Sequence, residues 1–235
     1  MTDAHTTPSE PLPNLLARAI GIITSPKATF EKIVKTPKVA GILALVAVVM
    51  GLAQGGFLMT TKGQDAFMAM MTSRPGMSEQ ALAGMEKMLP YMGYFSIAQF
   101  IVFIPIMAAI FSLIFFVVFN AIMGGTATYK QVMSVITHSM VIGTVGLLFA
   151  LPITYMRGTM STVGPANLGA LLPMLDEGSF AAKFFGMIDL FTAWGIVVES
   201  IGLGVLYKRS GRTIATVLFA IYIIVVGGIA YFTSR

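Results

Sequence analysis

The sequence predicts an all-α integral membrane protein, a bundle of five transmembrane helices. Residues 88–129 contain no Asp, Glu, Lys or Arg, and the stretches 39–61, 131–156 and 213–234 are equally free of these residues. A hydrocarbon core ~30 Å thick needs about 20 apolar residues per helical span, which each stretch supplies. Hydrophobic residues make up 56% of the chain and charged residues 11%, whereas soluble domains carry about 25% charged residues. A water-soluble fold is therefore excluded.

Composition also limits the function. The 235 residues allow one helical bundle and its loops, with no separate soluble catalytic domain. The chain has no Cys, and its only histidines are His5 and His138, so a metal site or a hydrolytic triad would be hard to assemble. No phosphate-binding glycine motif is present. We therefore expect no enzyme activity, no cofactor and no metal.

The N-terminal region divides into two parts. Residues 1–11 are polar and are expected to form a disordered tail, and residues 12–38 are expected to form a cytoplasmic interfacial helical segment. The apolar cluster 15–23 is interrupted by Arg18 and lacks a small-residue cleavage site, so it does not resemble a signal peptide. The dipeptide Ser25-Pro26 predicts a capped helix start.

That helix would be amphipathic. Phe30, Ile33 and Val34 share one face, while Lys27 and Lys32 are available to reach lipid headgroups. The alternative is a polar linker, because the segment is short.

Residues 39–235 are expected to form the membrane domain. Five spans place the two termini on opposite sides of the membrane. Lys and Arg mark the cytoplasmic side of membrane proteins, and the net charge of +5 is read as this signal rather than as nucleic-acid binding. The N-terminus is therefore expected in the cytoplasm and the C-terminus outside, in the cytoplasmic (inner) membrane. The predicted spans are 39–59, 96–122, 132–154, 184–206 and 214–233, and the basic residues that set the orientation are Arg18, Lys27, Lys32, Lys35, Lys38, Lys130, Lys208, Arg209 and Arg212.

The first outer loop is rich in methionine. Thioethers select Cu(I), so one hypothesis is a copper site. However, the apolar residues after Ser78 recur at helical spacing, which favours an amphipathic outer-loop helix in which Met fills space. We take this second interpretation. The methionines are Met59, Met68, Met70, Met71, Met77, Met85, Met88 and Met92, and the apolar positions after Ser78 are Ala81, Leu82, Met85, Met88, Leu89 and Met92.

Small residues within the spans predict close helix packing. Gly51 and Gly55 lie four apart on the first span, and Gly146 and Ala150 repeat the spacing on the third. The contact can lie within one chain or between copies, so an oligomer is possible. Gln54 is a polar residue in mid-span that could line a cavity.

Three intramembrane residues, His138, Asp189 and Glu199, form the candidate polar cluster. A charged residue near the bilayer centre costs ~3 kcal/mol or more, so such residues face the bundle interior, a watery cavity or a partner. His138 and Glu199 have similar depths, each roughly 12 Å from the nearest basic flank at about 1.5 Å per residue. We expect them to meet. The pair would be either a structural lock between helices or part of a proton or solute pathway.

Several short segments occur in a characteristic order, and together they resemble the bacterial branch of the Yip-domain family, five-span membrane proteins named for binding Ypt/Rab GTPases. The resemblance covers most of residues 23–233. One departure is His138-Ser139-Met140-Val141-Ile142, where a proline is expected nearby. The segments are Thr24-Ser25-Pro26 with Phe30 and Pro37, Gly124-Gly125-Thr126-Ala127-Thr128-Tyr129-Lys130-Gln131, Asn167-Leu168, Asp189-Leu190-Phe191-Thr192-Ala193-Trp194, and Ile201-Gly202-Leu203 followed by Lys208-Arg209-Ser210.

The resemblance implies a non-enzymatic membrane protein that acts through protein partners in membrane organisation or transport. Rab binding is not implied, because the N-terminal region is much shorter than in eukaryotic members. We expect an accessory or scaffold subunit that contacts the lipid bilayer and other integral membrane proteins, such as those of a transporter complex. The alternative is a small transporter or channel that uses His138, Asp189 and Glu199.

Overall fold

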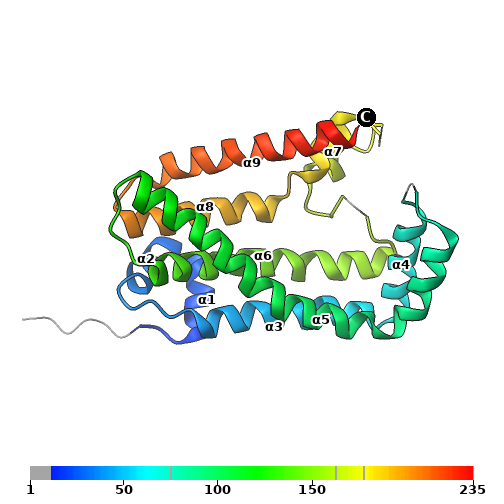
Figure 1. Cartoon of the computed structure of the whole chain (residues 1–235), viewed down its shortest axis with the longest axis horizontal. Helices are drawn as coiled ribbons and strands as arrows, with labels where there is room; N and C mark the ends of the chain where they lie inside the picture. Colours follow the sequence, from blue (N-terminus) through cyan, green and yellow to red (C-terminus); the bar gives the residue numbers. More distant parts are fainter. Residues whose placement is uncertain (1–11, 75, 162, 177, 235) are drawn as a thin grey trace, which may run out of the picture.

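In the described part of the computed structural model, five helices are long and apolar enough to cross a membrane, as the sequence predicted. The structure describes residues 12–74, 76–161, 163–176 and 178–234, so the expected tail 1–11 lies outside the described residues. Within the described residues the fold is all-α, and the helices lie side by side (Figure 1). The spanning helices are α3 (Ala40–Leu58), α5 (Glu79–Phe116) with its π-helical continuation η1 (Val117–Ile122), α6 (Tyr129–Arg157), α8 (Leu190–Tyr207) and α9 (Gly211–Thr233).

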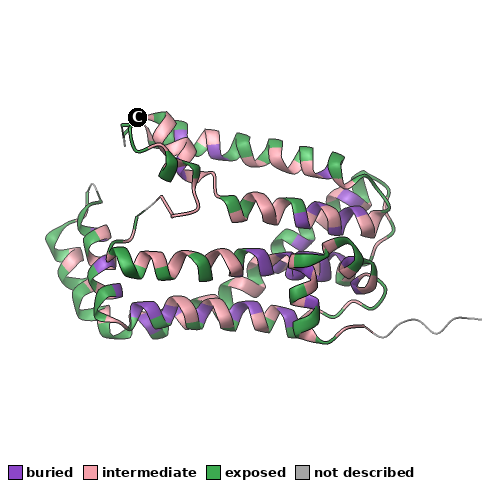
Figure 2. Cartoon of the chain, turned by 180° about the vertical axis from the view of Figure 1, so that it is seen from behind, coloured by how far each residue is buried: buried purple, intermediate pink, exposed green. Residues whose placement is uncertain are grey.

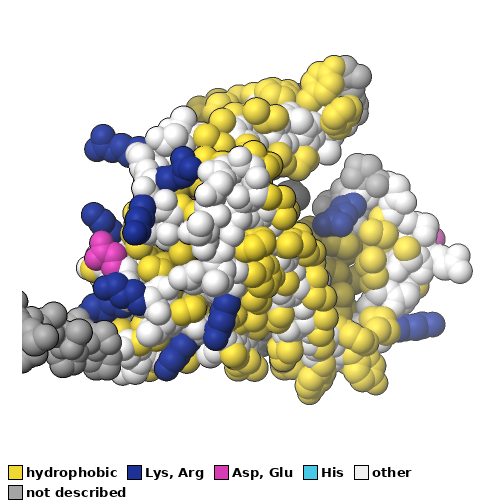
Figure 3. All heavy atoms as spheres, turned by 60° about the vertical axis from the view of Figure 1, so that its left-hand side comes forward, with side chains coloured by type: hydrophobic (Ala, Val, Ile, Leu, Met, Phe, Trp, Pro, Cys, Tyr) yellow, Lys and Arg dark blue, Asp and Glu magenta, His cyan; other side chains and the backbone are white. Residues whose placement is uncertain are grey.

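The two ends of the bundle differ. Helices α1 (Leu15–Thr24) and α2 (Pro26–Ile33) lie at one end, which we call the basic end. Figure 3 shows Lys and Arg side chains gathered there and hydrophobic side chains along the flank. The other end, which we call the outer end, carries α4 (Thr61–Thr72), the 3-10 turn η2 (Leu168–Leu171), α7 (Phe180–Met187) and the C-terminus (Figure 1). The described part of the chain therefore begins at the basic end and finishes at the outer end.

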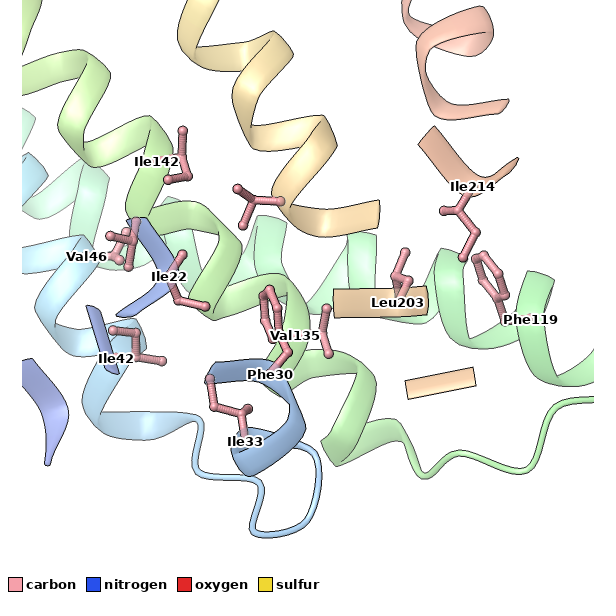
Figure 4. Close-up of a cluster of buried hydrophobic side chains, with 12 residues drawn as sticks. Ile22, Phe30, Ile33, Ile42, Val46, Phe119, Val135, Ile142, Leu203 and Ile214 are labelled. Carbon is pink, nitrogen blue, oxygen red and sulfur yellow. The ribbon is translucent and has the colours of Figure 1, made fainter. Parts of the chain in front are cut away.

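Helix α2 is present as predicted, but it packs more deeply than an interfacial helix. Phe30 and Ile33 are fully buried in the hydrophobic core (Figure 4). The polar-linker hypothesis is therefore wrong. Pro26 occupies the first helical turn, but the Ser25 side chain makes no capping hydrogen bond. The predicted Ser25 cap is wrong because its backbone departs from the extended geometry of a usual N-cap.

The predicted outer-loop helix is the first part of α5 rather than a separate element. The Ser78 hydroxyl accepts from the Ala81 amide at 3.2 Å and caps the helix. Leu82 and Met85 are half-buried while Glu86 and Lys87 are exposed, so the segment is amphipathic. The helix continues through Pro90 and Pro105 into the second span without a boundary near residue 96.

The fourth span is shorter than predicted. The chain breaks between α7 and α8, at Ile188 and Asp189, so residues 184–187 belong to α7 and the span begins at Leu190. The Asp189 carboxylate accepts from the Thr192 amide at 2.8 Å, which starts a new helix. Asp189 therefore caps the outer end of a span and does not lie inside one.

Helix α6 is the centre of the bundle. Buried residues concentrate on α6 and α3, whereas α9 is largely exposed along its length (Figure 2). The small residues on α3 serve contacts within the chain, because a Cβ atom on Gly55 would lie 2.5 Å from Ile97 of α5. In the same way, Gly146 of α6 leaves room for Phe191 of α8.

Candidate functional site

A buried polar contact joins Arg18 of α1 to His138 of α6. Arg18 Nη1 lies 3.1 Å from His138 Nε2, and His138 Nδ1 lies 2.6 Å from the Ser134 carbonyl oxygen. Arginine only donates hydrogen bonds and a carbonyl only accepts them. The ring therefore carries its proton on Nδ1 and accepts from Arg18 at Nε2. His138 is a neutral imidazole in this arrangement.

Arg18 is the charged member of this pair and is 6% exposed. Burial lowers the pKa of Arg18 from its ordinary value, but arginine stays protonated in proteins. Among the described residues, the only hydrogen-bond partner of its side chain is His138, and its Nε has none. The contact ties α1, which is outside the spans, to the central helix. In the sequence the one signal for it was the interruption of an apolar cluster by Arg18.

The predicted contact between His138 and Glu199 is wrong. Both ring nitrogens of His138 bond other groups, Arg18 on one side and Ser134 on the other. The sequence predicts similar depths for the two residues, but it does not give the direction in which each side chain points. The structure therefore separates His138 from the two acids of the predicted cluster.

Asp189 and Glu199 line one cavity, which we call the Glu199 cavity. It has a volume of ≈ 740 Å³ and lies between α5, α6, α8, α9 and residues 164–167. Its polar lining comes from Ser139, Asn167, Thr192 and Tyr222 together with the two acids. The remaining walls are mainly apolar, and they include Phe111, Phe115, Leu147, Phe191, Ile196, Leu218, Ile221 and Val225.

Asp189 is held by several local contacts. Its carboxylate accepts from the Thr192 hydroxyl at 3.1 Å as well as from the Thr192 amide. Its own amide donates to the Tyr222 hydroxyl at 3.3 Å, and that hydroxyl donates to the Met187 carbonyl at 2.8 Å. Asn167 lies opposite Asp189 in an isolated antiparallel bridge. These contacts give Asp189 a structural role at the start of α8.

Glu199 differs from Asp189 in its surroundings. It lies about 15 Å further along α8 than Asp189, at about 1.5 Å per residue, and it is half-buried in the cavity wall. In the described part of the chain, no hydrogen bond or ion pair involves its carboxyl group. Towards the basic end, the buried side chains of Phe30, Val135 and Leu203 fill the bundle (Figure 4).

The other positions singled out by the sequence shape the packing. A Cβ atom on Gly202 would lie 2.6 Å from Val135 and 2.9 Å from Phe30, so glycine lets α2 approach α8. Gly124 has a φ of +71°, and Gly125 lies against the ring of Tyr207. Trp194 is half-buried against the core. Helix α6 is unbroken through residues 138–142, where the resemblance suggested a proline nearby.

Comparisons with known proteins agree with this architecture. The model of the Yip1 domain matches residues 20–233, a region that includes all five spans. A relative named Membrane protein YknW, from Bacillus subtilis (strain 168), is 26% identical over 211 residues. The match covers 87% of this chain and 86% of the relative. No solved structure matches the chain.

Proposed function

The chain belongs to the Yip1-domain family, and from that premise we propose that it is a non-enzymatic accessory subunit that assembles with another integral membrane protein. Glu199 carries this proposal, because its carboxyl group lies within a span and bonds no described residue. Such a group costs ~3 kcal/mol or more in the bilayer unless it is satisfied. A hydrogen-bonding or basic side chain on a partner helix would satisfy it.

The surroundings of Glu199 fit a helix partner. The cavity lies between α5 and α9, and the exposed side chains of segments 101–114 of α5 and 217–232 of α9 are apolar. On α9, Ile221 and Val225 line the cavity and are 53% and 51% exposed. Polar side chains bonded across helices help to hold membrane helices together. A partner helix would thus cover the apolar surface beside the cavity and supply a polar contact at the depth of Glu199.

The same proposal includes the orientation in the cytoplasmic (inner) membrane. Lys27, Lys35, Lys38, Lys130 and Arg212 are exposed at the basic end. Cytoplasmic loops carry an excess of Lys and Arg, so we place this end in the cytoplasm and the outer end outside. Protein partners would then reach the outer helices α4 and α7 from the external side.

A small transporter or channel is the second candidate function. It is favoured by the line of polar groups from Asp189 through Thr192 to Glu199, all on one cavity. The packed side chains of Phe30, Val135 and Leu203 count against it, because they close the bundle beyond Glu199. Transport would require a second conformation that opens this core.

Site-specific photo-crosslinking in intact membranes tests the accessory function. A photoreactive amino acid at Ile221 or Val225 should capture one membrane protein of defined mass, identified by mass spectrometry. Ile224 is the matched control, since it lies on the same helix, is 72% exposed and does not line the cavity. Capture should be strong at the two cavity positions, weak at the control position, and lost when Glu199→Leu is added.

Two outcomes would reject the accessory function. The first is equal capture at all three positions, which would indicate random encounters in the membrane. The second is flux of a solute or protons into liposomes that contain this chain alone, abolished by Glu199→Leu while the melting temperature is unchanged. That result would establish the transporter. Crosslinked product of twice the mass of the chain would identify the partner as a second copy.

A further inference from the structure

A second cavity lies at the outer end and is lined by methionine. It has a volume of ≈ 700 Å³ and lies between α3, α4, the first half of α5 and the segment after α6. Five of its lining residues are methionines, and we call it the methionine cavity. They are Met70 of α4, Met85, Met88 and Met92 of α5, and Met160.

The methionines come from three separate parts of the chain. Met85, Met88 and Met92 follow helical spacing on one face of α5. Met70 and Met160 reach the same cavity from α4 and from beyond α6, and the sequence pattern did not group Met160 with them. Methionine side chains that only fill a core are closely packed and line no large void. Here methionine side chains from three segments line one partly open pocket, so filling a closed core does not explain the arrangement.

The donor set determines what the cavity can hold. Of the residues that the structure describes, no acid, histidine or basic residue lines it, and its polar groups are Gln54, Ser96 and Gln99. Among the described residues there is also no group of three His, Cys, Asp or Glu that could hold a metal ion. Hard ions prefer carboxylate and other oxygen ligands, and Zn²⁺ and similar divalent ions prefer imidazole or thiolate, whereas neutral thioethers select Cu(I).

We propose that the methionine cavity binds a soft monovalent metal ion, Cu(I), through thioether sulfur atoms. The cavity is held in place from several sides. Gln64 Nε2 donates to the carbonyls of Leu58 and Leu89, at 3.2 and 3.4 Å, and so links α3, α4 and α5. The Lys62 ammonium lies 5.0 Å from the centroid of the Tyr155 ring and links α4 to α6. Within this frame, methionine has three rotatable bonds with which to converge on an ion.

Metal binding to the purified full-length chain in detergent tests the site. Ag(I) serves as the first probe because it is soft and monovalent and does not change its oxidation state. Cu(I), kept reduced and held by a coloured chelator, serves as the second. We expect one ion per chain and transfer of Cu(I) from the chelator to the protein. X-ray absorption of the bound copper should show sulfur ligands without nitrogen.

A set of Met→Leu variants identifies the ligands, because the exchange nearly conserves side-chain volume. Met85→Leu, Met88→Leu and Met92→Leu together should weaken binding more than ~100-fold, beyond the 10- to 100-fold loss typical of groups that only orient a metal's ligands. Met107→Leu, Met133→Leu and Met140→Leu, all outside the cavity, form the control and should leave affinity unchanged. The melting temperature of each variant without metal shows whether it is folded.

Three results would overturn the proposal. They are no transfer from the chelator, equal loss of affinity in both triple variants, or nitrogen ligands in the absorption spectrum. In one further outcome, the metal fails to bind but a neutral apolar dye binds, and substitutions at Met85 and Met88 weaken the binding of the dye. The cavity is then a site for apolar molecules instead.

Discussion

The guanidinium of Arg18 donates to Nε2 of His138 across 3.1 Å, and this hydrogen bond joins a helix outside the spans to the most buried helix of the bundle. The two members differ in charge. Arg18 stays cationic and His138 is neutral, so the bond mainly satisfies a buried charge. Removing Arg18 and removing His138 should therefore lower the free energy of unfolding by different amounts.

His138→Leu should destabilise the protein more than Arg18→Leu. The first change leaves a buried guanidinium without its acceptor, and removing one partner of a buried charged group costs about 3–5 kcal/mol. The second removes the charge and leaves a neutral acceptor, at about 1–3 kcal/mol. Thermal unfolding in a mild detergent measures both changes.

The double variant Arg18→Leu with His138→Leu should cost less than the sum of the single variants, because residues in contact are not additive. Lys27→Leu is the control, since Lys27 is exposed at the basic end. Strict additivity of the two changes would show that the hydrogen bond contributes nothing to stability.

The sequence correctly predicted features that depend on the composition of one segment. It did not predict features that depend on contacts between segments. Charge-free runs gave the number of spans correctly, because the bilayer requires every span to be long and apolar. They could not give the break before Asp189, since apolar residues continue through it and the bridge to Asn167 comes from a different loop. Matching depths placed His138 and Glu199 at one level, yet Arg18 reaches His138 from a helix whose docking only the tertiary structure reveals.

Gly202→Ala tests the close approach of α2 to α8. The added methyl group would lie 2.6 Å from Val135 and 2.9 Å from Phe30, both held in the core. Overpacking of this kind costs about 1–3 kcal/mol, so the melting temperature should fall. Gly228→Ala is the matched control, because nothing lies within 4 Å of the added atom and it is also in a helix. That variant should be neutral or more stable by up to about 1 kcal/mol. Equal effects of the two changes would contradict the packing at Gly202.

Variants at Asp189 distinguish a capping role of this residue from a role in transport. Asp189→Asn keeps a side-chain oxygen for the Thr192 amide and should keep stability, while Asp189→Ala should lose about 1 kcal/mol. Both variants should still capture the partner at Ile221. If Asp189→Asn abolished flux or capture at unchanged stability, the carboxylate charge itself would be required and capping would be an insufficient account.

The orientation of the bundle can be measured because the natural chain contains no Cys. Thr36→Cys and Met174→Cys place single thiols at exposed sites of the basic and outer ends respectively. A membrane-impermeant maleimide applied to intact cells should label only the outer thiol, because Lys and Arg retain the basic end in the cytoplasm. Permeabilised cells should allow both thiols to react, while Ser134→Cys, fully buried in α6, is the unreactive control. Labelling of both exposed sites in intact cells would mean that an even number of spans separates them. Labelling at Thr36→Cys alone would keep an odd number of spans between the two sites but reverse the orientation.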